Sequence, residues 1–251
     1  MIKILKKTVL ILLFFIISIW ADEPLKYEDK RIVSHVVDPK QSELNLYLKD
    51  DNGTILNTFG NLKSHLKKKN KELLFAMNGG MYMENSMPLG LYVEKGKRIK
   101  KANRVKKAFG NFYMQPNGVF FMTKKRNAYI KKTTDFQLKE YVNFATQSGP
   151  MLLIDGKMHP RFMKGSKNVH IRNGVGILAD GRVLFAISNE MINFYDFATF
   201  FKKNGCKNAL YFDGAISDIY LPPKHEGYTH NRFGVMVAEV KSIEKEIDVK
   251  K

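Results

Sequence analysis

Residues 174–188 read GVGILADGRVLFAIS, two apolar runs joined by Asp180-Gly181. Residues 151–158 repeat this pattern as MLLIDGKM around Asp155-Gly156. Asp-Gly between apolar runs predicts a tight β-hairpin, because glycine accepts the positive φ that the turn requires. Nearer the N-terminus, leucine alternates with more polar residues over 44–48, which is typical of a half-buried strand. The chain is therefore predicted to consist mainly of antiparallel strands.

Two short helices are expected to pack against these strands. Apolar residues in 59–66 have the spacing of an amphipathic helix, and an aromatic stripe over 194–201 predicts a second one. Asn193 is the expected cap of the second helix and Gly205 its stop. No internal repeat, low-complexity tract or Pro/Gly linker divides the chain. We therefore expect a single α+β domain with a mixed, largely antiparallel β-sheet, several hairpins and a few packed helices.

The N-terminus has the pattern of an export signal. Lysines in the first seven residues precede the apolar run TVLILLFFIISIW at 8–20, and Ala21 then offers a small residue for cleavage. The apolar run is shorter than the roughly 20 residues of a membrane-spanning helix. We expect residues 1–21 to be a signal peptide and 22–251 to be a periplasmic or secreted domain. An uncleaved N-terminal anchor is the alternative.

The chain is strongly basic, with 42 Lys and Arg against 24 Asp and Glu, a formal net charge of +18. Only eight of the basic residues are arginines, and the lysines are scattered in pairs along the chain. Because base and phosphate recognition favours arginine, this pattern argues against a nucleic-acid partner. It is typical of a solvated lysine-rich surface, which could also contact anionic envelope polymers or lipid headgroups.

Cysteine and histidine usage predicts neither a disulfide nor a metal centre. Cys206 is the single cysteine, so no intramolecular disulfide can form, and we expect this side chain to be buried. The six histidines include no HxH or HxxxH pair, which argues against zinc. No cofactor is expected.

Four segments combine a polar residue with glycine directly after an apolar strand or at the start of one. They are Asn78-Gly79-Gly80, Ser148-Gly149, Arg172-Asn173-Gly174 and Asp213-Gly214. Each could be an ordinary turn. Glycine at such a place also lets backbone N–H groups approach a ligand closely. Four such segments in one chain favour a common ligand site.

The same segments resemble the phosphodiester glycosidase family, the uncovering-enzyme-like domains, and in particular its short bacterial periplasmic members. The resemblance covers roughly residues 45–240 and is carried, in order, by FAMNGGMY, PNGVFF, ATQSGPMLLIDGK, RNGVGILADGRVLFAISN and ALYFDGAISDIYL. It implies hydrolysis of a sugar-1-phosphodiester. Two positions depart from the family pattern: Gly79 replaces the usual alanine, and Ala215 replaces a glycine that matters if its amide packs against substrate.

The chemistry that the resemblance implies suits these residue types. A phosphate monoester leaves readily, so the site mainly has to hold phosphate and stabilise an oxocarbenium-like transition state. Arg172 is the expected phosphate fork, and the amides of Gly79, Gly80 and Gly149 an expected anion nest. Asp213, at the end of an apolar strand, is the expected nucleophile, general base or electrostatic stabiliser. A turn-capping carboxylate is the alternative for Asp213.

His170 lies two residues before Arg172, so strand alternation would place both on one face, with His170 as acid or phosphate partner. A structural histidine is equally compatible. Further substrate contacts are expected from polar and glycine residues of the four segments: Asn78, Ser148, Asn173, Gly214 and Ser217. The second carboxylate stays open between Asp218 and Glu190.

These observations favour an exported hydrolase that cleaves a sugar-1-phosphodiester in an envelope or extracellular glycan. A catalytically silent glycan- or phosphate-binding protein on the same scaffold is one alternative. A basic envelope-associated structural protein is the other.

Overall fold

The computed structural model describes residues 24–214, 216–224 and 232–243. The predicted signal peptide and Ala215 lie outside these residues. Within the described part of the chain, no helix is long and apolar enough to span a membrane.

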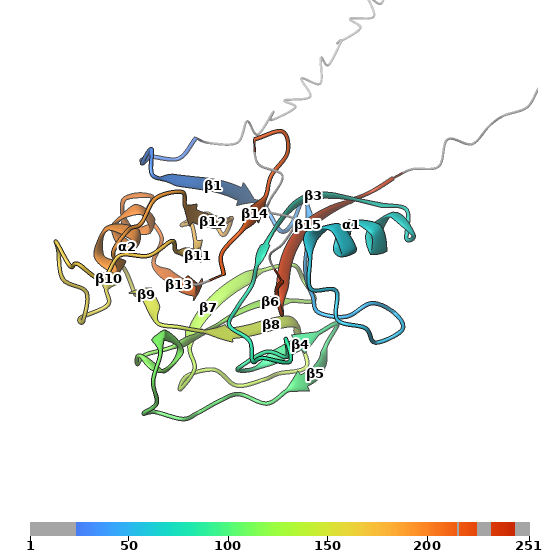
Figure 1. Ribbon diagram of the computed structural model, residues 1–251, viewed down its shortest axis with the longest axis horizontal. Helices are drawn as coiled ribbons and strands as arrows, with labels where there is room; N and C mark the ends of the chain where they lie inside the picture. Colours follow the sequence, from blue (N-terminus) through green and yellow to red (C-terminus); the bar gives the residue numbers. More distant parts are fainter. Residues whose placement is uncertain (1–23, 215, 225–231, 244–251) are drawn as a thin grey trace, which may run out of the picture.

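The strands form three sheets in which every pairing is antiparallel, as the hairpin signals predict (Figure 1). The first sheet, sheet A, holds both predicted Asp-Gly hairpins. Its strands, in spatial order, are β1 (Ile32–Val37), β12 (Val183–Ser188), β11 (Asn173–Ile177), β13 (Asn208–Asp213), β9 (Met151–Ile154) and β10 (Lys157–Met158).

The two other sheets complete the domain. Sheet B contains β14 (Ile219–Tyr220), β3 (Lys71–Asn78), β15 (Met236–Ser242) and β2 (Glu43–Tyr47). The third, sheet C, contains β5 (Lys97–Lys100), β4 (Tyr92–Glu94), β8 (Val142–Ser148), β6 (Gly118–Thr123) and β7 (Ala128–Lys132). A short 3₁₀ turn, η1 (Asn111–Tyr113), precedes β6. The class is α+β, as expected.

Buried phenylalanines join the three sheets at the centre of the molecule. Phe185 of sheet A packs against Phe75 of sheet B at 5.0 Å between ring centroids, and against Phe120 of sheet C at 6.2 Å. Phe120 also contacts Phe212 of β13 at 6.1 Å. All four rings are fully buried. Because these rings would otherwise be exposed to water, their burial holds the sheets together.

The two predicted helices cover the outer faces of sheets A and B. In Figure 1, α2 (Phe194–Lys203) lies at the left of the molecule and α1 (Phe59–Lys67) at the right. The Asn193 side chain accepts a hydrogen bond from the Asp196 backbone and caps α2, as predicted. The aromatic stripe of α2 packs on sheet A beside Cys206. Burial raises the pKa of the Cys206 thiol to about 12, so this cysteine is an unreactive core residue.

A contact between His35 and Glu239 ties sheet A to sheet B beside the buried phenylalanines. His35 Nε2 of β1 lies 2.7 Å from Glu239 Oε2 of β15, and the His35 ring packs on Phe75. Burial would raise the pKa of Glu239, but hydrogen bonds from His35 and Ser42 outweigh it and leave the pKa below its ordinary value. The ionised form of Glu239 is therefore favoured in the folded protein.

We predict that Glu239→Gln destabilises the protein at pH 7 by about 1–2 kcal/mol. Because the folded-state pKa is depressed, the contribution is complete above the unfolded pKa and is lost as pH falls through the folded pKa. Urea unfolding at pH 7 and at decreasing pH below about 4.5 measures this difference. Glu140→Gln, at an exposed position, is the matched control. A destabilisation that persists unchanged in acid would contradict the assignment.

Candidate active site

The four polar-glycine segments of the sequence lie at the ends or starts of strands, and each contributes a residue to one meeting point. β3 ends at Asn78, β8 ends at Ser148 and β13 ends at Asp213, while Asn173 begins β11. These strands belong to all three sheets. A network of hydrogen bonds between the sheets connects Asn78, Ser148 and Asp213 through Asn173. Arg172, which was expected to converge with them, bonds to Ile192 and Asn168 instead.

The side chain of Asn173 is the centre of this network. Its Nδ2 donates to Asn78 Oδ1 at 2.6 Å and to the Asn78 carbonyl at 3.1 Å. Its Oδ1 accepts from the Asp213 backbone N–H at 2.8 Å. Both asparagines are fully buried. One carboxamide thus fixes the end of sheet B and the start of the Asp213 turn relative to each other.

Sheet C is joined to the same point by two hydroxyls of β8. Ser148 Oγ donates to the Phe212 carbonyl at 2.6 Å, and Thr146 Oγ1 donates to the Gly79 carbonyl at 2.9 Å. Both hydroxyls are buried. Ser148 therefore positions β13 just before Asp213, and its hydrogen is already used within the protein.

Asp213 is half-buried at the point where the three sheets meet. Its Oδ1 accepts from the Gly214 N–H at 2.6 Å, and Ser217 Oγ donates to its carbonyl at 3.0 Å. The register of β11 against β13 shifts between Asn173 and Gly174, beside Asp213. This irregularity turns the end of β13 away from a regular ladder.

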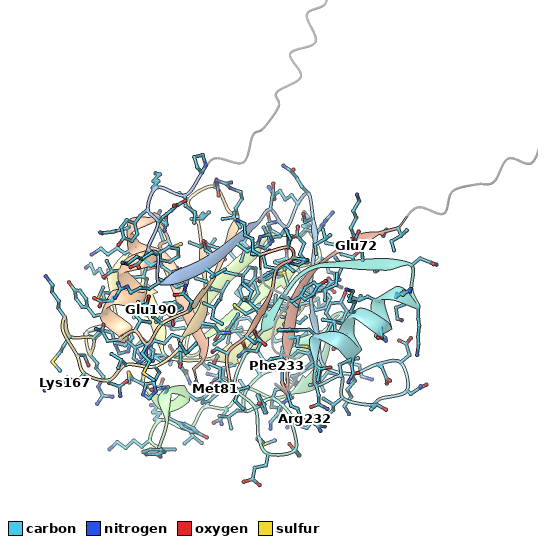
Figure 2. The ribbon with its side chains drawn as sticks, turned by 45° about the horizontal axis from the view of Figure 1, so that its top comes forward. Glu72, Met81, Lys167, Glu190, Arg232 and Phe233 are labelled. Carbon is cyan, nitrogen blue, oxygen red and sulfur yellow. The ribbon has the colours of Figure 1, made fainter. Side chains whose placement is uncertain are left out.

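Two further groups, Asp218 and Tyr82, adjoin the network around Asp213. Asp218 is 1% exposed; its N–H donates to Asn78 Oδ1 at 3.2 Å, and its Oδ1 accepts from the Ile219 N–H. Burial, and secondarily the charge of Asp213, raise the pKa of the half-buried Tyr82. Glu190 is exposed in the turn after β12 (Figure 2) and takes no part in the network. Of the two carboxylates left open, Asp218 is the one that adjoins Asn78.

Two glycines of the site are required by close packing. Gly80 has φ 153°, and a Cβ there would lie 2.8 Å from Thr146 Oγ1. A Cβ at Gly214 would overlap the Tyr211 hydroxyl. The N–H of Gly79 already donates to the Val235 carbonyl at 2.8 Å, so it does not contribute to an anion nest in this conformation.

Arg172 lies on the other side of β11 from Asn173 and is completely buried. Its Nε donates to the Ile192 carbonyl at 2.8 Å, and its Nη2 donates to Asn168 Oδ1 at 2.8 Å. The guanidinium carbon lies 3.5 Å from the centre of the Phe194 ring, and Phe162 stacks on the far face of that ring. Burial lowers the pKa of Arg172. The guanidinium is therefore bonded to the protein itself and, contrary to the expected phosphate fork, is not exposed to solvent.

His170 does not share the environment of Arg172, so the same-face prediction was wrong. Its side chain is exposed, while its backbone pairs with Ile192 as an isolated bridge. Regular strand structure begins only at Asn173, and strand alternation does not extend back to 170. In Figure 2 Lys167 marks this segment at the edge of the molecule.

No three His, Cys, Asp or Glu residues are grouped to hold a metal ion in the described part of the chain.

Comparison with known proteins shows the family of this chain. The sequence model of the phosphodiester glycosidase family matches residues 71–232. The chain belongs to the phosphodiester glycosidase family. The uncharacterized protein YigE of Escherichia coli K12 is 35% identical over 191 residues, which cover 76% of this chain and 74% of YigE.

Solved structures share the phosphodiester glycosidase fold at low sequence identity. The catalytic domain of zebrafish N-acetylglucosamine-1-phosphodiester α-N-acetylglucosaminidase, auto-inhibited by its pro-peptide, aligns with a TM-score of 0.54 and 13% identity, covering 86% of this chain and 85% of that one. A Burkholderia pseudomallei protein described as a candidate exported protein aligns with a TM-score of 0.55 and 10% identity, covering 83% and 73%.

We predict that Asn173→Ala destabilises this phosphodiester glycosidase domain by about 2–4 kcal/mol, because Asn78 and the Asp213 N–H each lose a buried partner. Chemical unfolding measures the change. Asn189→Ala, at an exposed position after β12, should change stability by less than about 0.5 kcal/mol. Equal effects of the two substitutions would show that the Asn173 bridge is not required.

Proposed function

We propose that this protein is an exported hydrolase that cleaves a sugar-1-phosphodiester in an envelope or extracellular glycan. The observation that carries the proposal is the position of Asp213, a half-buried carboxylate held where the three sheets meet. Membership of the phosphodiester glycosidase family supports the reaction class.

In the proposed reaction the bond between the anomeric carbon and the phosphate oxygen breaks. The phosphate monoester leaves with the bonding electrons, and the sugar develops oxocarbenium character that a nearby carboxylate stabilises. Water supplies the new oxygen on the anomeric carbon. Asp213 fills the role of nucleophile, general base or electrostatic stabiliser, and Asp218 is the second carboxylate of the site.

Substrate contact is assigned to the groups around Asp213 that the fold leaves available. Asn78 Nδ2 is buried and has no hydrogen-bond acceptor among the described residues, so it is the proposed amide donor to a substrate oxygen. Gly80, Gly214 and Ser217 border the same point. Asn173 and Ser148 are proposed to position these groups, because their polar atoms bond to the protein itself.

Arg172 is proposed as a positioning residue. Its guanidinium lies 5.6 Å from the centre of the Tyr211 ring, and the Tyr211 hydroxyl lies directly against Gly214. Phe162 and Phe194 therefore hold Arg172 beside Tyr211, and Tyr211 in turn packs against the Asp213-Gly214 turn. His170, exposed two residues earlier, is the proposed surface contact for phosphate.

Export is part of the proposal. Residues 1–21 are the proposed signal peptide and 22–251 the phosphodiester glycosidase domain. The lysine-rich surface suits peripheral contact with anionic envelope polymers or lipid, since the net charge is +18.

A silent glycan- or phosphate-binding protein is the second candidate. The complete burial of Arg172 favours it, because the most obvious phosphate ligand in the sequence is not free to bind a substrate. The two functions share a scaffold and a ligand class, so only turnover distinguishes them.

We predict that residues 22–251 release free sugar and phosphomonoester from N-acetylglucosamine-1-phosphodiesters or UDP-N-acetylglucosamine. Asp213→Asn should reduce kcat by a factor of about 10³ or more, because the charge that stabilises the transition state is lost. Asp155→Asn is the matched control, since Asp155 has φ 49° in an exposed hairpin turn that asparagine tolerates. Chromatographic product analysis over time gives both rates.

Arg172→Lys separates positioning from direct phosphate binding. A positioning role predicts lower stability together with lower kcat, whereas a phosphate ligand would raise KM and leave stability unchanged. Turnover that is unaffected by Asp213→Asn would refute the assignment of the site. No turnover on any diester would favour the silent binding protein.

A further inference from the structure

A cavity lies beside the end of β8 in sheet C, where Gln147 bonds to its lining residues Asn103 and Thr133. Its volume is about 590 Å³. Its lining residues come from the segments before β6 and after β7 and are Asn103, Arg104, Lys106, Gln115, Pro116, Asn117, Thr133 and Thr134. The proposed hydrolytic reaction uses none of them.

The lining has one sign of charge and many hydrogen-bonding groups. Arg104 and Lys106 supply two cations, while carboxamides and threonine hydroxyls supply neutral donors and acceptors. None of the residues that line the cavity is acidic. Asp135, outside the lining, accepts a hydrogen bond from the exposed Thr134 at 2.7 Å. A ligand with a negative group and several hydroxyls complements this set.

Arg104 is fixed by the protein even though it is exposed. Its Nη1 donates to the Thr133 carbonyl at 3.2 Å, and its Nη2 donates to the Phe136 carbonyl at 3.4 Å. These bonds leave the remaining N–H groups of the guanidinium for an anion. A side chain that is already ordered loses less entropy when it binds a ligand.

Asn117 provides an independent sign of a ligand site. It is 1% exposed, and its Nδ2 donates to the Phe112 carbonyl at 3.0 Å. Its Oδ1 is buried without a hydrogen-bond partner among the described residues. A buried acceptor left unpaired costs free energy, so its place in the cavity wall indicates a donor such as a sugar hydroxyl.

We propose that this cavity binds an anionic saccharide, a sugar that carries a phosphate or carboxylate group. The acid group lies between Arg104 and Lys106, and the sugar hydroxyls bond to the carboxamides and threonines. That the saccharide belongs to the same glycan as the cleaved diester rests on the proposed function; binding itself does not.

The cavity and the candidate active site share one strand end. Gln147 and Ser148 are neighbours on β8, so their side chains point to opposite faces. Gln147 bonds both to the N–H and to the carbonyl of Asn103, at 2.9 and 2.7 Å, while Ser148 bonds to β13 beside Asp213. A glycan held in the cavity is thereby kept close to the proposed reaction centre.

The test is an NMR titration, observed on the protein of residues 22–251, that measures the binding of defined probes. The probes are N-acetylglucosamine 6-phosphate, glucuronic acid, neutral N-acetylglucosamine and inorganic phosphate. The test variant is Arg104→Gln/Lys106→Gln. The matched control, Arg98→Gln/Lys125→Gln, removes the same charge at exposed positions outside the cavity.

We expect at least one anionic sugar to bind more tightly than both the neutral sugar and inorganic phosphate. Its Kd should rise about tenfold or more in the test variant, and stay within about twofold of the wild type in the control. The anionic sugar with the lower Kd shows whether the cavity prefers a phosphate or a carboxylate group. Binding should persist in Asp213→Asn, which separates this proposal from the catalytic one.

Equal loss of affinity in both double variants would overturn the proposal, since general surface charge would then explain binding. The proposal would also be overturned if neither anionic sugar bound. The same holds if inorganic phosphate bound as tightly as the anionic sugars. Thermal unfolding checks that the variants are folded. The single substitution Lys106→Gln, at an exposed side chain, keeps the test decisive if the double variant is unstable.

Discussion

The carboxamide of Asn173 is the interaction on which the rest of the site depends. It accepts from the Asp213 N–H with one end and donates to Asn78 with the other, inside a core from which water is excluded. Buried polar groups must be paired, so this side chain fixes two sheets in a single relative position. Ser148 adds the third sheet through the Phe212 carbonyl. The carboxylate of Asp213 is held by this arrangement and not by its own loop alone.

Arg172, directly before β11, is held apart from this hydrogen-bond network. Asn173, the first residue of β11, bonds to sheet B, whereas Arg172, the residue before it, packs against α2. There the guanidinium stacks on Phe194 and lies near Tyr211, whose hydroxyl packs against Gly214. One strand start therefore supports the Asp213 turn from two sides, by hydrogen bonding on one and by stacking on the other.

Local signals made much of this fold predictable, and non-local contacts account for what was missed. The two Asp-Gly hairpins, the aromatic face of α2 and the buried Cys206 follow from turn chemistry and periodicity, and the structure confirms them. The meeting of the strand ends was also foreseen from the glycine segments. The burial of Arg172 was not, because it depends on Phe194 and Phe162, which are distant in sequence. Asp218 could have been chosen only by knowing that β14 pairs with β3 beside Asn78.

The most direct test of the central claim, that the protein cleaves the glycosidic bond of a sugar-1-phosphodiester, is hydrolysis of an N-acetylglucosamine-1-phosphodiester in water enriched with oxygen-18. Mass spectrometry of the products locates the label. Attack at the anomeric carbon predicts the label in the released sugar and none in the phosphomonoester. Label in the phosphomonoester would show cleavage of the phosphorus–oxygen bond and contradict the account.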